Sequence, residues 1–418
     1  MSFQQGLSGL KGASSNLDVI SNNIANSSTV GFKTSQSQFA DVYASSVYGT
    51  SALQVGIGTQ VSEIAQQFTQ GNVTVTNNPL DMGISGEGFF KLTPPGSNAI
   101  SYTRNGQFHL DGNGYIVNST GQILQGWLAN ASGIVVPGAT KSLQIAFTPA
   151  PPKTTSTATL SANLDAGATV PAGAISPSNP STYNWSTSMT VYDQLGVASG
   201  LVFYFKKTAS NSWNFDMYVN NNLVVGPPGG AATPTHTITF NTNGSVNQID
   251  GAAAAAFSPT IPAATLGSGA AALTFSLDLT GFTQYGTTFG TSQVTQDGYS
   301  SGRIAGLSVA KDGTIQGRYT NGQSRTLGQV VLTSFNNPRG LLPLGNNQWA
   351  NTQAAGAAVE NTPGSGVLGV LQSGSVEESN VDLTAELVNM IVAQRLYQAN
   401  AQSVRAQDQL LQTLVNLR

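Results

Sequence analysis

The chain has no cysteine, only two histidines among its 418 residues, and only 8% charged residues. Without cysteine, the chain can form no disulfide, no thiolate nucleophile and no cysteine-ligated metal site. A net charge of -3 without runs of like charge provides neither a phosphate-binding stripe nor a polybasic patch for membranes. We therefore expect no nucleic-acid partner and no cofactor.

Long apolar runs are also missing. No window holds about 18 consecutive apolar residues, so we expect no membrane insertion. The first residues, MSFQQGLSGLKGASSNL, lack the basic and apolar regions of a Sec-type signal peptide. Ordinary soluble domains contain about 25% charged residues, so this surface must consist largely of Ser, Thr, Asn, Gln and Gly.

Two apolar stripes with helical spacing lie near the two ends of the chain. Residues 2–27 contain the first stripe, formed by Phe3, Leu7, Leu10, Leu17, Ile20 and Ile24. Phe3, Leu10, Leu17 and Ile24 lie seven residues apart, which predicts a helical seam. Glycines at positions 6, 9 and 12 each cost about 1 kcal/mol relative to alanine in a helix, so this helix is expected to be weak.

Residues 380–418 contain neither glycine nor proline, which predicts a long helix. Ser379 and Asp382 have the spacing of a capping box at its start. The second apolar stripe consists of Leu383, Leu387, Met390, Tyr397, Val404, Leu411 and Leu414, most of them seven apart.

The two stripes suggest helices that pair, because each helix must bury its apolar side. The seam alone leaves open whether they pair within one chain or between subunits. We predict a mixed α and β fold in which the terminal helices form a coiled-coil-like stalk. Short runs rich in Val, Ile, Thr, Phe and Tyr between turn signals predict two nested, mainly antiparallel β domains between them.

Composition shifts give the expected domain boundaries. The divisions are an N-terminal helix (1–30), a linking segment (31–70), the first part of an inner β domain (71–145), an inserted outer β domain (146–285), the second part of the inner domain (286–372) and a C-terminal helix (373–418).

No catalytic or metal-binding constellation emerges from the residue spacing. His109 and His236 have no second histidine or cysteine nearby to complete a metal site. Residues 111–114, Asp-Gly-Asn-Gly, lack the later ligands of a calcium loop and predict a type I′ hairpin turn. The glycines of residues 83–90 lack the spacing of a phosphate-binding loop. We therefore expect a protein without enzymatic activity.

Near the N-terminus the sequence reads NLDVISNNIAN followed by SSTVGFK, which includes Asn16, Asp18, Asn22, Asn23, Asn26, Gly31, Phe32 and Lys33. This signature resembles that of the flagellar axial family of rod, hook and hook-associated proteins. Residues 379–402 are similar to the family's C-terminal helix. GEGFF at 86–90, YTRNGQF at 102–108 and GQVVL at 328–332 also resemble family members.

The resemblance implies a structural subunit of the bacterial flagellar hook, a flexible curved tube that transmits motor torque from rod to filament. The length, with room for an outer domain, favours a hook subunit over the shorter distal rod protein. The implied partners are further copies of the chain in a helical homopolymer, the type III export apparatus, the hook cap, the distal rod and hook-filament junction proteins, and the hook-length control protein.

The implied location is extracellular, in the hook and basal body, after export without a cleaved signal peptide. The alternatives are another axial subunit such as the distal rod protein, or a secreted β-rich adhesin or binding module.

Overall fold

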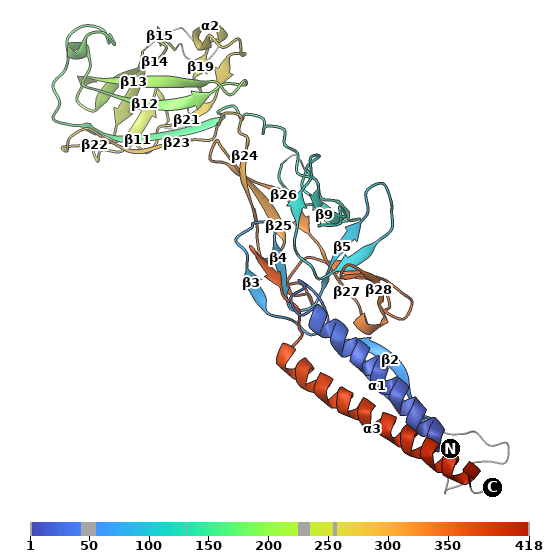
Figure 1. The fold of residues 1–418 in the computed structure, drawn as a ribbon. Coiled ribbons are helices and arrows are strands. Elements are labelled where there is room, and N and C mark those ends of the chain that lie inside the picture. Colours follow the sequence, from blue (N-terminus) through green and yellow to red (C-terminus); the bar gives the residue numbers. More distant parts are fainter. Residues whose placement is uncertain (1, 43–55, 131, 225–234, 254–256, 417–418) are drawn as a thin grey trace. The chain divides into compact units, whose positions relative to one another are not determined.

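The computed structural model describes residues 2–42, 56–130, 132–224, 235–253 and 257–416 (Figure 1). The chain divides into two compact units. The inner unit contains residues 1–147, 305–318 and 324–418, and the outer unit contains residues 148–304 and 319–323. The chain contains helices as well as sheets, and the sheets are mainly antiparallel, so the predicted mixed α and β class is confirmed.

The ends of the chain form two long helices in the inner unit. Helix α1 spans Ser2–Ala25 and helix α3 spans Leu383–Asn416. The N-terminal cap of α3 is Asp382, whose Oδ1 accepts hydrogen bonds from the backbone N–H groups of Thr384 (2.9 Å) and Ala385 (3.1 Å). The helix therefore begins three residues later than the expected start at 380.

The segment expected as a linker contains a β-hairpin. Strands β1 (Ser35–Val42) and β2 (Gly58–Gln66) pair in antiparallel register, with an irregularity between Gln38 and Phe39. The hairpin packs against α1, which Figure 1 shows beside β2 and α3.

A large sheet dominates the rest of the inner unit, with the path β24-β25-β26-β9-β5-β6-β29-β28. Its core contains a cluster of aromatic side chains, in which Phe89 and Trp349 lie edge to face. The elements of this region are β3 (Val73–Val75), β4 (Met82–Ser85), β5 (Phe89–Thr93), β6 (Ser101–Thr103), β7 (His109–Leu110), β8 (Ile116–Val117), β9 (Ile123–Leu128), β10 (Lys141–Ser142), β24 (Ile304–Val309), β25 (Thr314–Tyr319), β26 (Ser324–Val330), β27 (Leu332–Ser334), the 3₁₀ helix η2 (Pro338–Gly340), β28 (Leu342–Gly345), β29 (Gln348–Ala350), β30 (Val359–Asn361), β31 (Val370–Ser373) and β32 (Ser375–Glu377).

The outer unit packs two sheets around an apolar core that includes Trp213, Phe203, Phe205 and Phe215. One sheet has the path β12-β13-β14-β16-β17-β18, and β11 is central to the other. The elements are β11 (Thr157–Asp165), the 3₁₀ helix η1 (Pro180–Thr182), β12 (Trp185–Tyr192), β13 (Ala198–Ala209), β14 (Ser212–Val219), β15 (Asn222–Leu223), β16 (His236–Phe240), β17 (Val246–Ile249), β18 (Ala252–Ala253), β19 (Thr260–Ile261), α2 (Ala263–Leu266), β20 (Leu273–Thr274), β21 (Ser276–Asp278), β22 (Thr283–Tyr285) and β23 (Gly290–Gln296).

The turn at residues 111–114 is not of type I′. Of these four residues only Gly114 has a positive φ, of 83°, whereas a type I′ turn requires two consecutive positive values. The Asp111 carboxylate instead accepts hydrogen bonds from the N–H groups of Asn113 (2.9 Å) and Tyr115 (2.7 Å). This side-chain bridging favours an Asx-type turn over the expected conformation.

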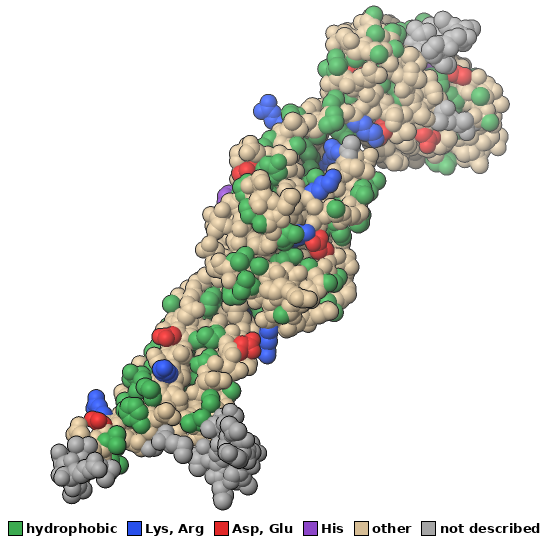
Figure 2. Space-filling model, turned by 90° about the vertical axis from the view of Figure 1, so that its right-hand side faces the viewer, with side chains coloured by type: hydrophobic (Ala, Val, Ile, Leu, Met, Phe, Trp, Pro, Cys, Tyr) green, Lys and Arg blue, Asp and Glu red, His purple; other side chains and the backbone are tan. Residues whose placement is uncertain are grey.

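Charged side chains are sparse on the molecular surface. Figure 2 shows uncharged polar groups and backbone over most of one face, with only scattered acidic and basic groups. None of the helices in the described part of the chain is long and apolar enough to cross a membrane.

Candidate assembly surface

The two ends of the chain meet at a buried cluster of charges. The Lys33 ammonium lies 2.6 Å from Glu377 Oε1, and both side chains are fully buried. Lys33 also donates to the Thr69 carbonyl (2.7 Å), and the N–H of Gly71 donates to Glu377 Oε1 (2.9 Å). The guanidinium of Arg104 lies 3.3 Å from Glu377 Oε2. Glu377 thus binds the end of the N-terminal signature to the inner sheet.

Burial is the largest influence on the two cations of this cluster. It lowers the pKa of Lys33 and that of Arg104, while the charge of Glu377 acts in the opposite direction on both. Arg104 also donates to the Gly86 carbonyl (2.9 Å) and lies over the ring of Phe89. The contacts of Glu377 with the two cations therefore form only when three separate segments of the chain are correctly placed.

Backbone contacts reinforce this junction. Gly31 has φ of 71°, and its N–H donates to the Glu377 carbonyl (2.8 Å). A Cβ on Gly31 would lie 2.6 Å from the backbone nitrogen of Asn105, so only glycine fits. The Asn380 side chain accepts from the Thr34 N–H (2.7 Å) and donates to the Gln67 carbonyl (2.8 Å).

Helices α1 and α3 pair in antiparallel directions. Asn23 Nδ2 donates to Glu386 Oε1 (3.1 Å) at one end of the pair. Towards the other end, a Cβ on Gly6 would lie 2.9 Å from Val404 Cγ2, and one on Gly9 would lie 2.9 Å from Asn400 Nδ2. The glycines that weaken α1 as an isolated helix therefore allow α3 to approach it closely.

The hairpin covers another side of α1. A Cβ on Gly12 would lie 3.2 Å from Phe39 Cε1. Asn23 Nδ2 donates to the Ser35 carbonyl (2.8 Å), and its Oδ1 accepts from the Ser35 N–H (2.9 Å). Gln5 Nε2 donates to the Gly56 carbonyl (2.6 Å). Helix α1 is thus covered by both α3 and the hairpin.

The covered side of α3 differs from the stripe expected from the sequence. Its buried or half-buried residues are Glu386, Met390, Ala393, Asn400, Ala401, Val404 and Gln407. Met390 and Val404 belong to the expected stripe, but small or polar residues fill most companion positions. The reason is that the facing helix presents glycines and an asparagine, which accommodate small and polar partners.

The large apolar residues of α3 lie on its other sides. We call the outer face the group Leu383, Leu387, Val388, Ile391, Val392 and Leu396, whose side chains are 46–55% exposed. Val392 and Leu396, at one edge of this group, also line a pocket against α1 and β1. Isolated exposed apolar residues are ordinary, but a continuous group marks an interaction surface.

The remaining expected stripe residues divide between buried and exposed positions. In α1, Ile20 is buried, Leu10, Leu17 and Ile24 are half-buried, and Phe3 and Leu7 are exposed. In α3, Tyr397 and Leu411 are exposed. The side chain of Leu414 lies outside the described residues.

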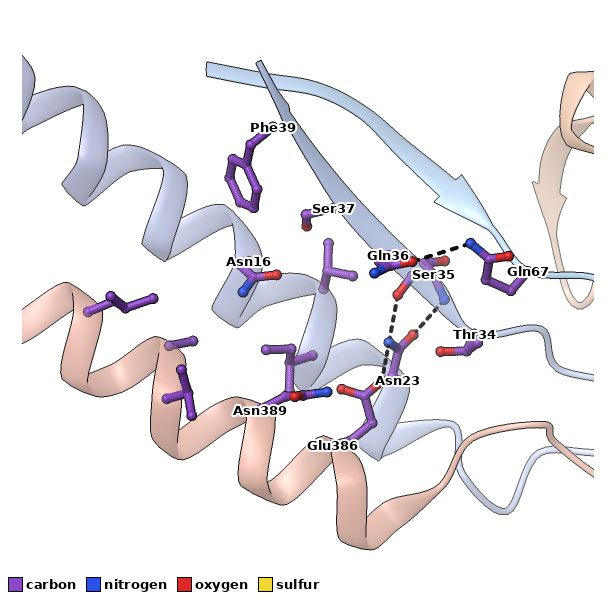
Figure 3. Close-up of a pocket in the computed structure, with 15 residues that line it drawn as sticks. Asn16, Asn23, Thr34, Ser35, Gln36, Ser37, Phe39, Gln67, Glu386 and Asn389 are labelled. Carbon is purple, nitrogen blue, oxygen red and sulfur yellow. Dashed lines mark hydrogen bonds between the residues drawn. The ribbon is translucent and has the colours of Figure 1, made fainter. Parts of the chain in front are cut away.

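The signature residues concentrate around the helix end and the junction. Asn22 accepts from Asn26 Nδ2 (3.0 Å), Asn26 Oδ1 accepts from Thr29 (3.2 Å), and Phe32 is buried. Asp18 is exposed. Asn16 instead lines a pocket between α1, β1 and α3 (Figure 3).

This pocket, of about 390 Å³, is lined by both apolar and polar side chains. Val19, Ile20 and Ala393 are apolar lining residues, whereas Asn16, Ser37, Glu386 and Asn389 supply polar groups. Figure 3 shows Ser37 and Glu386 on opposite sides of it, from β1 and α3. The Ser37 hydroxyl is buried and has no hydrogen-bond partner among the described residues.

Four family models match successive parts of the chain. They are the flagellar basal body rod protein (3–33), the flagellar hook protein FlgE/F/G D1 domain (83–148), the flagellar basal body protein FlaE D2 domain (163–299) and the flagellar basal body rod FlgEFG protein C-terminal region (372–417).

Full-length relatives decide the family. The chain is 41% identical over 424 residues to the flagellar hook protein FlgE of Escherichia coli K12, and 42% identical over 429 residues to that of Salmonella typhimurium LT2. Each alignment covers 100% of both chains. The chain belongs to the flagellar hook protein FlgE family. It is a structural component of the flagellar hook, and this family is not enzymatic.

A solved structure supports the fold of this FlgE family member. The Helicobacter pylori flagellar hook protein FlgE2 is similar with a TM-score of 0.50 and 12% sequence identity. The similarity covers 73% of this chain and 99% of the other.

Glu377 and Arg104 are the main site residues that sequence reasoning missed in this FlgE family member. Glu377 is 344 positions from Lys33 and 273 from Arg104, so no local spacing indicates their contact. The available signal was weak: Lys33 and Arg104 each lie within a stretch that resembles the family, in a chain where charged residues are rare.

Proposed function

We propose that the outer face of α3 is the surface through which copies of the chain polymerise into a flexible, curved tube. The single observation that supports this most directly is the continuous group of half-exposed apolar side chains from Leu383 to Leu396. A second copy that covers it would remove apolar surface from water, worth about 25 cal/mol per Å².

In this proposal the paired terminal helices act as a coiled-coil-like stalk, and the two β domains are nested between them. The sequence places the outer domain at residues 146–285, inserted into an inner domain of 71–145 and 286–372. The compact outer unit extends further along the chain, over 148–304. The close approach at Gly6 and Gly9 supports such a stalk, because small residues permit tight helix packing.

The assembled tube works as a universal joint between rod and filament. Bending requires contacts far from the tube axis to slide during each rotation. A surface with few charges suits this, because uncharged hydrogen bonds and water contacts exchange without a fixed charge register.

The proposed partners and location follow from membership of the hook family. Export by the flagellar type III apparatus delivers the chain to the growing extracellular hook. There it contacts the hook cap, the distal rod protein, the hook-filament junction proteins and the hook-length control protein.

Electron microscopy of concentrated purified protein tests the assembly surface. We expect tubes from the unaltered chain and discrete particles from the variant V388Q/I391Q, whose substituted side chains are 55% and 50% exposed in the subunit. The matched control, L195Q/V197Q in the outer unit, changes residues of similar exposure and should still form tubes. Normal tubes from V388Q/I391Q would contradict the proposal.

A further inference from the structure

A positively charged side chain interrupts the apolar outer face of α3. Arg395 follows Val388, Ile391 and Val392 by seven, four and three residues, so it lies on the same side of the helix. It is exposed and has no hydrogen bond or ion pair within the described part of the chain. A second copy that covers this face removes the guanidinium from water, and a buried charge requires an ionic or hydrogen-bonded partner.

The other exposed cations of the helix pair have different surroundings. Arg405 has the polar residues Gln402, Asp408 and Gln409 as its helical neighbours, so it lies on a solvent-exposed polar part of the helix. Lys11 lies on α1, four residues after the exposed Leu7, and is therefore not part of the outer face of α3. Arg395 is thus the cation that the outer face would bury.

The pocket between α1, β1 and α3 has the complementary chemistry. Glu386 contributes a carboxylate whose Oε1 accepts from Asn23, while Oε2 has no hydrogen bond within the described residues. The Ser37 hydroxyl is buried without a partner in the same region. The apolar lining, with Val19, Ile20 and Ala393, can cover the methylene stem of an arginine.

We propose that Arg395 of one copy inserts into this pocket of a neighbouring copy and pairs with Glu386, with the Ser37 hydroxyl accepting a further hydrogen bond. The proposal rests on the proposed function, because the outer face must meet a second copy. This contact orients one subunit on the next, because a charge pair within an apolar face favours one register.

Charge reversal tests this contact by its effect on the critical concentration for tube formation, measured by sedimentation and electron microscopy. R395E places two carboxylates together and should raise the critical concentration at least tenfold. E386R should do the same by opposing two guanidinium groups. The matched control R405E changes an exposed arginine of the same helix and should remain within twofold of the unaltered chain.

A mixture that brings opposite charges together again distinguishes the loss of an ion pair from general damage to the helix. An equimolar mixture of R395E and E386R subunits should form tubes, because each copy finds an opposite charge on its neighbour. Since E386R also removes the bond from Asn23, E386Q serves as a second variant, because it retains an oxygen acceptor and should weaken assembly less. Circular dichroism of each monomer verifies that the helices remain folded.

Two results would overturn the proposal. One is a critical concentration for R395E within twofold of the unaltered chain. The other is failure of the mixture to assemble although both variants are folded, which would place Arg395 against another acidic residue. In either case tubes from the unaltered chain, and their loss in V388Q/I391Q, would leave the proposed function intact.

Discussion

At the scale of single residues, the most constrained group is the carboxylate of Glu377. It is fully buried and contacts the cations of Lys33 and Arg104, while its backbone carbonyl accepts from Gly31. Buried ion pairs gain little net stability over apolar packing, but removal of one partner leaves uncompensated charge in a dry interior. The cluster therefore adds little net stability when it is complete, but any structure in which one chain end is misplaced leaves a buried charge without its partner.

We predict that E377A destabilises the inner unit by about 3–5 kcal/mol, because two buried cations lose their counter-ion. Urea unfolding followed by amide exchange of the inner sheet measures this change. The matched control is E360A, which removes the partner of Lys91 from a pair whose side chains are 11% and 26% exposed. That pair is closer to the surface than the Glu377 cluster and involves a single cation, so its loss should cost less than that of Glu377.

The variant E377Q refines the interpretation of that experiment. It removes the charge but retains an oxygen that can accept from Lys33 and from the Gly71 N–H. Its stability should fall between those of E377A and the unaltered chain. Equal effects of E377A and E360A would show that the buried cluster does not hold the chain ends together.

At the scale of elements, helix α1 illustrates two opposite effects of glycine. Each glycine lowers helix propensity, yet Gly6 and Gly9 lie where a Cβ would approach Val404 or Asn400 to 2.9 Å. The unfavourable propensity is offset by tertiary contacts with α3 and the hairpin, as is usual for helices in proteins.

We predict that G6L destabilises the helix pair by about 1–3 kcal/mol, because its side chain overlaps that of Val404. Amide exchange of residues 2–25 should accelerate about five- to hundredfold in consequence. The double variant G6L/V404A removes the overlapping methyl groups and should recover most of the protection. The control Q4L places leucine at an exposed position and should have little effect. Similar exchange in G6L and Q4L would contradict the close packing.

The sequence was informative about these elements where the signal is local. A long glycine-free segment predicted α3, and its start was misplaced by three residues because Asp382, rather than Ser379, caps the helix. The seven-residue repeat located the apolar stripe but not its partner. Which side of α3 is covered depends on Gly6 and Gly9, residues almost 400 positions away, and local periodicity contains no such information.

The same limit applies to the candidate site. The N-terminal signature includes Asn23, Gly31 and Lys33, whose role in assembly stays a prediction, and family membership was confirmed by the comparisons. The pocket requires α1, β1 and α3 together, so Ser37 and Glu386 were not distinguishable from other polar residues.

At the scale of the whole molecule, the chain leaves the inner unit once for a long excursion and returns. Its two connecting segments pair as they enter and leave the outer unit, through bridges between Ala150 and Gly302 and between Lys153 and Tyr299. The Ala150 N–H donates to the Gly302 carbonyl at 2.8 Å. Because the entry and exit strands are adjacent, the outer unit can be removed without stretching the remaining chain.

We predict that replacement of residues 151–301 by an Asn-Gly turn leaves a folded protein that still forms tubes. A two-residue turn of this type suits adjacent antiparallel strands such as those at Ala150 and Gly302. The junction at Lys33 and Glu377, the helix pair and the outer face of α3 all lie within the inner unit and are retained. The tube should differ in stiffness or curvature, because contacts made by the outer unit are lost. Electron microscopy measures both the presence of tubes and their curvature, and a folded but non-polymerising product would place essential assembly contacts in the outer unit.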